Sequence, residues 1–292
     1  MKGGVLPRRE FVRLASSGVV AACAPSLPAL LSGCVAGDPS PSSARLLPGL
    51  QLYTLRSLLA EDPYGTLMVV GALGYEEVEL AGLYGLTPGQ MRSALDDDGL
   101  RAVSSHHDLA EIRGDWDATL EGALTLGQDW VVCPYIDSSE RSPDGYRKVA
   151  DEFNAAGEAA KAVGLGFAYH NHAFEFKLLT DGAVPYDLLL ERCDPGLVSM
   201  QMDVFWTVEG GADPLAYFAA HPGRFTSLHV KDRTAAGRMV AVGEGVIDYA
   251  GILSHAGEAG IRHLFVEHDD PEDPLESVRT SYDGLVRALE SR

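Results

Sequence analysis

Two histidines and a glutamate lie close together in the segment YHNHAFEF, residues 169–176. His170 and His172 are two residues apart, so both side chains would point to the same face of a β-strand. Glu175 follows within the same segment. Imidazoles and carboxylates bind divalent metals and transfer protons near neutral pH. The segment therefore indicates either a chemically active face at the end of a strand or a pair of core histidines satisfied by hydrogen bonds.

Further ionisable residues follow other short apolar segments. Asp203, His229 and Glu267 each come at the end of such a segment, and Lys231 lies two residues after His229. Oxygen and nitrogen ligands without a thiolate suit Mn²⁺, Mg²⁺, Co²⁺ or Zn²⁺ rather than copper(I) or an iron–sulfur cluster. Lys231 is either part of the same site or a surface lysine in a loop. The set predicts a divalent-metal site, provided that the fold brings these residues together.

The order of apolar segments predicts such a fold. Over residues 49–292, short apolar segments alternate with longer amphipathic ones, which is typical of a single (β/α)8 TIM barrel, an α/β fold. The expected strands are residues 50–53, 75–80, 101–105, 130–133, 166–172, 197–202, 227–230 and 263–266. The alternative is a doubly wound sheet, which would usually show a glycine-rich turn after its first strand. The segment LQLYTLRS contains no such turn.

A barrel of this kind carries its active site at the C-terminal ends of its strands. We expect polar side chains at those ends and apolar residues in the strand interiors. Besides the residues above, the strand ends offer Gln51, Tyr53, Glu79 and His106, and Trp206 follows the sixth strand. Polar groups and aromatic rings gathered at one face are typical of small-molecule sites. We interpret these five residues as substrate contacts, with core packing as the alternative for Trp206.

The chain resembles the xylose isomerase-like TIM barrels, the sugar phosphate isomerase/epimerase group, in the segments QLYTLR, VSSHHDL, YHNHAFEF, QMDVFW, LHVKDR, GEGVIDY and FVEHD. In ketose 3-epimerases of this group, a divalent metal is held by Glu, Asp, His and Glu from strands five to eight. The resemblance implies that Asp203, His229 and Glu267 are three of the ligands. His170 stands at the place of the first glutamate. Either His170 or Glu175 would complete the site, and we favour His170.

The resemblance also implies a chemistry. A divalent ion chelated by a hydroxyl and a neighbouring carbonyl oxygen acidifies the adjacent C–H bond and stabilises an enediolate. His172, Glu175, Lys231 and Glu267 are the candidates for proton transfer. Epimerisation, aldose–ketose isomerisation and loss of a β-substituent share this intermediate. We therefore predict a metal-dependent sugar isomerase or epimerase, and the sequence leaves a lyase or dehydratase open.

The N-terminal residues resemble an export signal. Arg8 and Arg9 precede an apolar run of small residues that ends in Leu-Ser-Gly-Cys at Cys34. This order is similar to a Tat-type signal followed by a lipoprotein cleavage box. We expect residues 1–33 to be the signal peptide and residues 34–48 a lipidated tether. The protein would then be periplasmic or on the cell surface, touching the membrane only through lipid on Cys34.

The charge composition limits the classes of molecule that the protein is expected to bind. The chain carries 42 acidic against 23 basic side chains, a net charge of −19, which disfavours nucleic acids and phosphate-rich ligands. DNA-repair endonucleases of the same superfamily need an additional histidine where this chain has Trp206. Nucleic acid is therefore not an expected partner.

The predicted substrate is a non-phosphorylated keto-sugar, foremost a 3-ketoglycoside produced by a partner sugar oxidoreductase. Export in the folded state would let the protein take up Mn²⁺ in the cytoplasm, before copper or zinc could compete for the site. Mn²⁺ is therefore the expected cofactor, ahead of Mg²⁺, Co²⁺ and Zn²⁺. The alternative function is that of a catalytically inactive, lipid-anchored sugar-binding protein.

Overall fold

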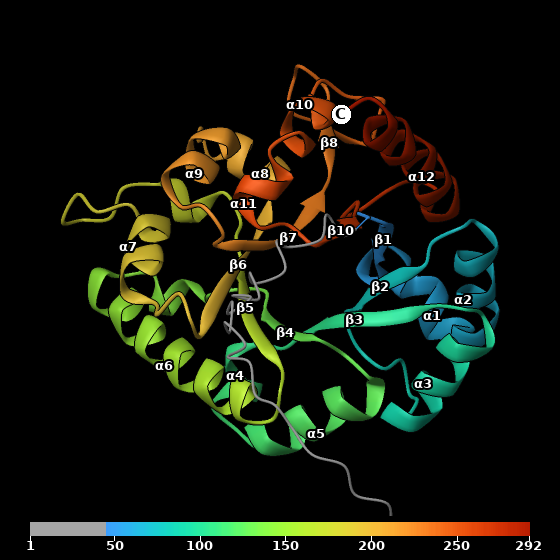
Figure 1. The fold of residues 1–292 in the computed structure, drawn as a ribbon, viewed down its shortest axis with the longest axis horizontal. Coiled ribbons are helices and arrows are strands. Elements are labelled where there is room, and N and C mark those ends of the chain that lie inside the picture. Colours follow the sequence, from blue (N-terminus) through green and yellow to red (C-terminus); the bar gives the residue numbers. More distant parts are fainter. Residues whose placement is uncertain (1–44) are drawn as a thin grey trace, which may run out of the picture. The chain divides into compact units, whose positions relative to one another are not determined.

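The computed structural model describes residues 45–292, which form a closed barrel of eight parallel strands (Figure 1). Cys34, the expected signal peptide and most of the expected tether lie outside the described residues. The barrel strands are β1 (Pro48–Gln51), β2 (Glu77–Leu80), β3 (Arg101–His106), β4 (Trp130–Cys133), β5 (Gly166–His170), β6 (Val198–Asp203), β7 (Phe225–Val230) and β10 (His263–Val266). Neighbours follow the chain order, and β10 pairs with β1 to close the barrel. The predicted TIM barrel is confirmed.

Helices surround the barrel (Figure 1). They are α1 (Arg56–Glu61), α2 (Pro63–Ala72), α3 (Pro88–Asp97), α4 (Leu109–Ile112), α5 (Trp116–Leu126), α6 (Pro143–Ala162), α7 (Pro185–Arg192), α8 (Val204–Glu209), α9 (Pro214–Ala220), α10 (Tyr249–Leu253), α11 (Ala256–Ala259) and α12 (Pro274–Glu290). Several connections thus carry two short helices where the alternation suggested one. After β1 the break has a clear cause, because Pro63 has no N–H with which to continue α1 and Asp62 caps α2 instead.

Among the described residues, none of the helices combines the length and the apolar composition that a membrane-spanning helix requires.

Two predicted strands end earlier than expected. β5 stops at His170, so His172 lies in the following loop and not on the strand. The side chain of Asn171 explains the stop, because its Oδ1 accepts the N–H of Asp203 at 3.1 Å in place of a backbone partner. β1 stops at Gln51, and Tyr53 lies in the 3₁₀ helix η1 (Leu52–Leu55), where the Tyr53 N–H donates to Gln51 Oε1 at 3.0 Å.

The interior of the barrel is polar, and the expectation of apolar strand interiors is wrong. Gln201 on β6 donates to Glu79 on the opposite strand β2 at 2.7 Å, and Ser104 on β3 donates to the same carboxylate at 2.6 Å. The apolar core lies instead between barrel and helices, formed by outward residues such as Leu228 and Leu264, which are fully buried. Hydrogen bonds therefore hold the barrel centre, where bulky aliphatic side chains are usual.

A second pair of strands, β8 (Asp232–Arg233) and β9 (Met239–Val240), forms a small antiparallel ribbon after β7. The Asp232 carboxylate, which is buried, accepts the N–H groups of Gly243, Gly245 and Ile247 at 3.0–3.2 Å. This one side chain ties down the loop that leads from the ribbon to α10. Because Asp232 is fixed in this way, the backbone of the preceding residue, Lys231, is also held in place.

Gly157 lets α6 pack closely against the segment that enters β6. A methyl group at Gly157 would lie 2.4 Å from the carbonyl oxygen of Leu197, whereas one at Gly122 in α5 would meet nothing nearer than 3.8 Å. Alanine stabilises a helix over glycine by about 1 kcal/mol where space is free, but overpacking costs about 1–3 kcal/mol. We predict that Gly157→Ala lowers the free energy of unfolding and that Gly122→Ala raises it, as measured by chemical denaturation. Changes of the same sign would contradict this packing.

Candidate active site

Three side chains from neighbouring strands converge at the C-terminal mouth of the barrel. Asp203 ends β6, His229 lies on β7, and Glu267 directly follows β10. One ligand atom from each lies within 4.8 Å of the others, and all three side chains are buried. His229 Nδ1 is 2.6 Å from Glu267 Oε2. The structure therefore brings together the three ligands that the resemblance implied.

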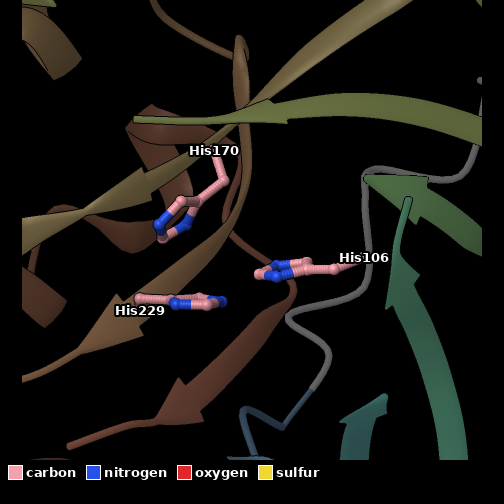
Figure 2. A group of neighbouring side chains, drawn as sticks. All are labelled: His106, His170 and His229. Carbon is pink, nitrogen blue, oxygen red and sulfur yellow. The ribbon is translucent and has the colours of Figure 1, made fainter. Parts of the chain in front are cut away.

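A second group shares His229. The rings of His106 on β3, His170 on β5 and His229 on β7 point toward one another in the barrel (Figure 2). The centroids of His170 and His229 are 4.3 Å apart, and His106 stacks on His229 with 5.4 Å between centroids. His170 Nε2 is 3.9 Å from Asp203 Oδ2. His170 thus belongs to this second group and lies beside Asp203 of the first.

Glu79 lies fully buried beneath these histidines. Its Oε1 is 2.6 Å from His229 Nε2, 2.9 Å from His106 Nε2 and 2.7 Å from Gln51 Nε2. Burial alone would raise the pKa of Glu79, but the two histidines hold this pKa well below its usual value. Burial likewise disfavours a charged His229, yet Glu267 and Glu79 together raise the pKa of His229 to about 10. The carboxylates at its two ring nitrogens therefore favour the protonated form of His229.

Lys231 is buried and faces the same mouth, which makes it part of the site and not a surface lysine. Its ammonium lies 3.0 Å from Asp203 Oδ2, 2.8 Å from Glu267 Oε2 and 2.6 Å from Asp269 Oδ1. Burial would lower the pKa of Lys231, but the three carboxylates raise it above its ordinary value. Lys231 therefore stays protonated here.

The side chains around Asp203 fit a divalent cation. Among the described residues, His170 Nδ1 is buried without a hydrogen-bond partner, and Asp203 Oδ2 is buried with no close partner other than the Lys231 ammonium at 3.0 Å. Such atoms are uncommon in folded proteins and call for a ligand or ion. Burial, reinforced by the nearby cations, lowers the pKa of His170 and keeps its imidazole neutral, as a metal ligand must be. The donor set is nitrogen and oxygen without sulfur, which suits Mn²⁺ or Zn²⁺.

Glu175 is not part of this convergence. Its carboxylate accepts hydrogen bonds from the Tyr169 hydroxyl and, at 2.9 Å, from the backbone N–H of His172. Tyr169 points away from the barrel axis because it alternates with His170 on β5. Burial raises the pKa of Glu175 to about 7. The structure thus brings His170, and not Glu175, next to Asp203, while Glu175 supports the loop that carries His172.

His172 lies at the mouth although it is outside the strand. Its ring is 5.1 Å from that of His170 and 5.9 Å from that of Trp206, measured between centroids. Its Nδ1 has no hydrogen-bond partner within the described part of the chain. Burial lowers the pKa of His172 to about 3, so the imidazole is neutral at physiological pH. A neutral ring with a free nitrogen is able to accept a proton.

The expected substrate contacts fall into two groups, and Tyr53 stands apart from both. His106 and Trp206 are partly exposed at the mouth, and Trp206 Nε1 lacks a partner within residues 45–292. Gln51 and Glu79 have no exposed surface and support His106 and His229 from below. Tyr53 is 41% exposed on η1, where its ring stacks with the Arg56 guanidinium 4.1 Å from its centroid. The side chains of His106, Trp206 and Tyr53 are therefore the ones that are exposed enough to contact a ligand directly.

Sequence reasoning missed two residues of the site. Gln201 joins Glu79 to His106, whose Nε2 is 3.1 Å from Gln201 Oε1. Asp269 holds the Lys231 ammonium. Both were recognisable by spacing, because each lies two residues from a candidate ligand and so shares its face along an extended chain.

Comparisons with known proteins identify the family and the fold of the chain. The family described as "Xylose isomerase-like TIM barrel" matches residues 69–287. An inosose dehydratase of Lacticaseibacillus casei is 29% identical over 98 residues, which are 34% of this chain and 32% of that protein. The chain thus matches about a third of that relative's length.

Two solved structures have the same fold. A sugar phosphate isomerase/epimerase from Parabacteroides distasonis superposes with a TM-score of 0.73 at 28% identity, covering 84% of this chain and 95% of that one. The IolI protein, solved with a zinc atom bound, superposes with a TM-score of 0.68 at 17% identity, covering 84% and 98%. At that lower identity the likeness to IolI concerns the fold alone.

The Glu79 network can be tested by removing one charge without changing volume. Glu79→Gln would leave two histidines without their carboxylate and would turn an amide N–H toward donors. Breaking a buried, hydrogen-bonded charge pair costs about 3–5 kcal/mol, so we predict a loss of that size in the free energy of unfolding. The control, Glu76→Gln, alters an exposed residue and should change stability by less than about 0.5 kcal/mol. Similar denaturation midpoints for the two variants would be incompatible with this network.

Proposed function

The chain belongs to the xylose isomerase-like TIM barrel family, and on that basis we propose that it is a divalent-metal-dependent sugar isomerase or epimerase. It would work through an enediolate of a non-phosphorylated keto-sugar. The observation that carries the proposal is the convergence of Asp203, His229 and Glu267 at the barrel mouth. An active site at this face is the rule for the fold.

Asp203, His229 and Glu267 would hold the cation, with His170 as the fourth ligand. Mn²⁺ is the first choice, with Mg²⁺, Co²⁺ or Zn²⁺ as alternatives. When bound there, a divalent cation would polarise the sugar carbonyl and acidify the neighbouring C–H bond. His229 would give up one proton on binding, because a ligating imidazole is neutral. Glu79 would then orient His229 from below, as an outer carboxylate commonly does for a ligating histidine.

The protein offers a base and an acid at one mouth. Neutral His172, with its unpartnered Nδ1, is suited to remove the proton beside the carbonyl. The protonated Lys231 is suited to return one, and Trp206 lies 5.9 Å from both groups. Opposite pKa shifts in neighbouring groups are the arrangement that acid–base catalysis uses. Glu267 would serve as ligand and as a further proton acceptor, whereas Glu175 would act on His172 through its backbone.

The substrate class rests on charge and on the N-terminal sequence. With a net charge of −19, the protein disfavours phosphorylated sugars. We propose export by the Tat-type signal and anchoring through lipid on Cys34, at a periplasmic or cell-surface location. A 3-ketoglycoside supplied by a sugar oxidoreductase would bring the carbonyl group that this chemistry requires. Its keto group acidifies the protons on both neighbouring carbons.

The reaction can be tested by exchange with solvent. Metal-stripped mature protein, reloaded with Mn²⁺, is incubated in D₂O with a 3-ketoglycoside and followed by NMR. We expect deuterium to enter beside the carbonyl at least about 100-fold faster than with the stripped protein, since charge stabilisation of this kind supplies such factors. The products then distinguish epimerase, isomerase and dehydratase. Sugar binding without exchange would support the sugar-binding alternative instead.

The ligand assignment makes a separate prediction. Asp203→Asn removes a charged ligand, and we expect the content of bound Mn²⁺ and the exchange rate each to fall more than about 100-fold, the upper range for support of a ligand. Asp97→Asn, in an exposed position at the end of α3, is the matched control and should change neither. Metal content is read by mass spectrometry of the dialysed protein. Undiminished metal binding by Asp203→Asn would place the cation elsewhere.

A further inference from the structure

The Lys231 ammonium contacts carboxylate oxygens of residues that are also candidate metal ligands. Two of its three carboxylate contacts, to Asp203 Oδ2 at 3.0 Å and to Glu267 Oε2 at 2.8 Å, involve members of the Asp203–His229–Glu267 set. The third contact, to Asp269 Oδ1 at 2.6 Å, does not. The positive charge of Lys231 therefore stabilises the carboxylates of Asp203 and Glu267, as a bound metal ion would.

We propose that Lys231 competes directly with the divalent cation and sets the metal affinity of the site. Cation binding releases the ammonium from Asp203 and Glu267 and leaves it with Asp269 alone, which it already contacts at 2.6 Å. This inference rests on the proposed metal site and adds to it a residue that controls its loading. The class of ligand concerned is a divalent metal ion with a preference for oxygen and nitrogen donors.

Sterics and charge make the two cations exclusive at these oxygens. A divalent ion held by Asp203 and Glu267 would lie about 2.0–2.2 Å from carboxylate oxygens, and the ammonium already contacts Asp203 Oδ2 at 3.0 Å and Glu267 Oε2 at 2.8 Å. Two like charges at that separation repel strongly in a water-poor site. One of them has to leave the shared oxygens.

The surroundings of Lys231 allow its side chain to move while its backbone stays fixed. The Tyr249 hydroxyl donates to the Lys231 carbonyl oxygen at 2.6 Å, and the next residue, Asp232, anchors the following loop. The flexible four-carbon stem can reorient its ammonium. Asp269, whose side chain is 33% exposed, offers a place at the rim.

After its release from Asp203 and Glu267, the Lys231 ammonium would act as the proton donor at the rim, where the substrate would enter. Asp269 lies after the end of β10, at the rim, and the Trp206 ring is 5.9 Å from the ammonium. Loading of the cation and presentation of the proton donor would then be one event. A protein without the cation would hold its acid among carboxylates, away from a ligand.

Equilibrium binding of Mn²⁺ tests the competition without reference to activity. Free Mn²⁺ is measured by electron paramagnetic resonance during titration of the metal-stripped full chain. We expect Lys231→Met to bind Mn²⁺ at least about ten-fold more tightly than the unchanged protein, since a cation is removed from beside the ligands. Lys148→Met removes the same charge from the exposed face of α6, where the side chain is 61% exposed, and should leave the affinity unchanged.

The role of Asp269 is tested by a double-mutant cycle. Asp269→Asn should weaken Mn²⁺ binding several-fold, because the displaced ammonium loses its place, whereas Asp270→Asn at an almost fully exposed neighbour should not. In the Lys231→Met background the effect of Asp269→Asn should shrink, since coupling appears only while both partners are present. Asp269→Asn at the rim also tests the proposal if Lys231→Met does not fold.

The outcomes separate this inference from the proposed function. If the unchanged protein binds Mn²⁺ and folded Lys231→Met binds it no more tightly, the competition is overturned and the metal site stands. Equal effects of Asp269→Asn in both backgrounds would overturn the role of Asp269. If neither protein binds Mn²⁺ or Zn²⁺, the metal site itself fails and the inference with it. Tight binding by Lys231→Met alone would be the strongest support.

Discussion

The site depends on a single buried charge, the carboxylate of Glu79 in the centre of the barrel. A carboxylate without exposed surface is tolerated only if its oxygens are fully hydrogen-bonded and its charge is paired. Glu79 meets this condition with five side chains from four strands, which are Gln51, Ser104, His106, Gln201 and His229. Each of these residues is thereby held in one orientation. The requirement to satisfy Glu79 is what fixes His106 and His229 at the mouth.

From Glu79 the charges alternate outward to the rim. His229 lies between Glu79 and Glu267, Lys231 lies between Glu267 and Asp203, and Asp269 receives the ammonium at the edge. Each member is stabilised by a neighbour of opposite sign, and all but Asp269 are buried away from water. A change of charge at one end of this series therefore changes the electrostatic environment of the next residue along it. This is why a cation near Asp203 and the position of Lys231 are linked.

The sequence was sufficient for the barrel and for the convergence of Asp203, His229 and Glu267, because strand alternation and the topology of a closed parallel barrel leave little freedom at the strand ends. It was insufficient where a side chain replaces a backbone partner, as Asn171 does at the end of β5. The polar interior around Glu79 was missed because a glutamate in a short apolar segment looks the same whether it faces a ligand or a hydrogen-bond network. The sequence also left Glu175 open as the less favoured alternative to His170, because proximity along the chain says little about which side of a strand a loop residue reaches.

The mouth also separates two proton-transfer groups by environment and not by type of residue. Burial and the nearby positive charge of Lys231 keep His172 neutral, whereas carboxylates keep Lys231 protonated, and Trp206 borders both. One side of the mouth can therefore take a proton while the other supplies one, without either group having to change its resting state first. Epimerisation, isomerisation and dehydration all need that pair. In the proposed reaction, the atom of the sugar that lies next to Lys231 would distinguish them, so the orientation of the sugar against Trp206 and His106 would decide which reaction occurs.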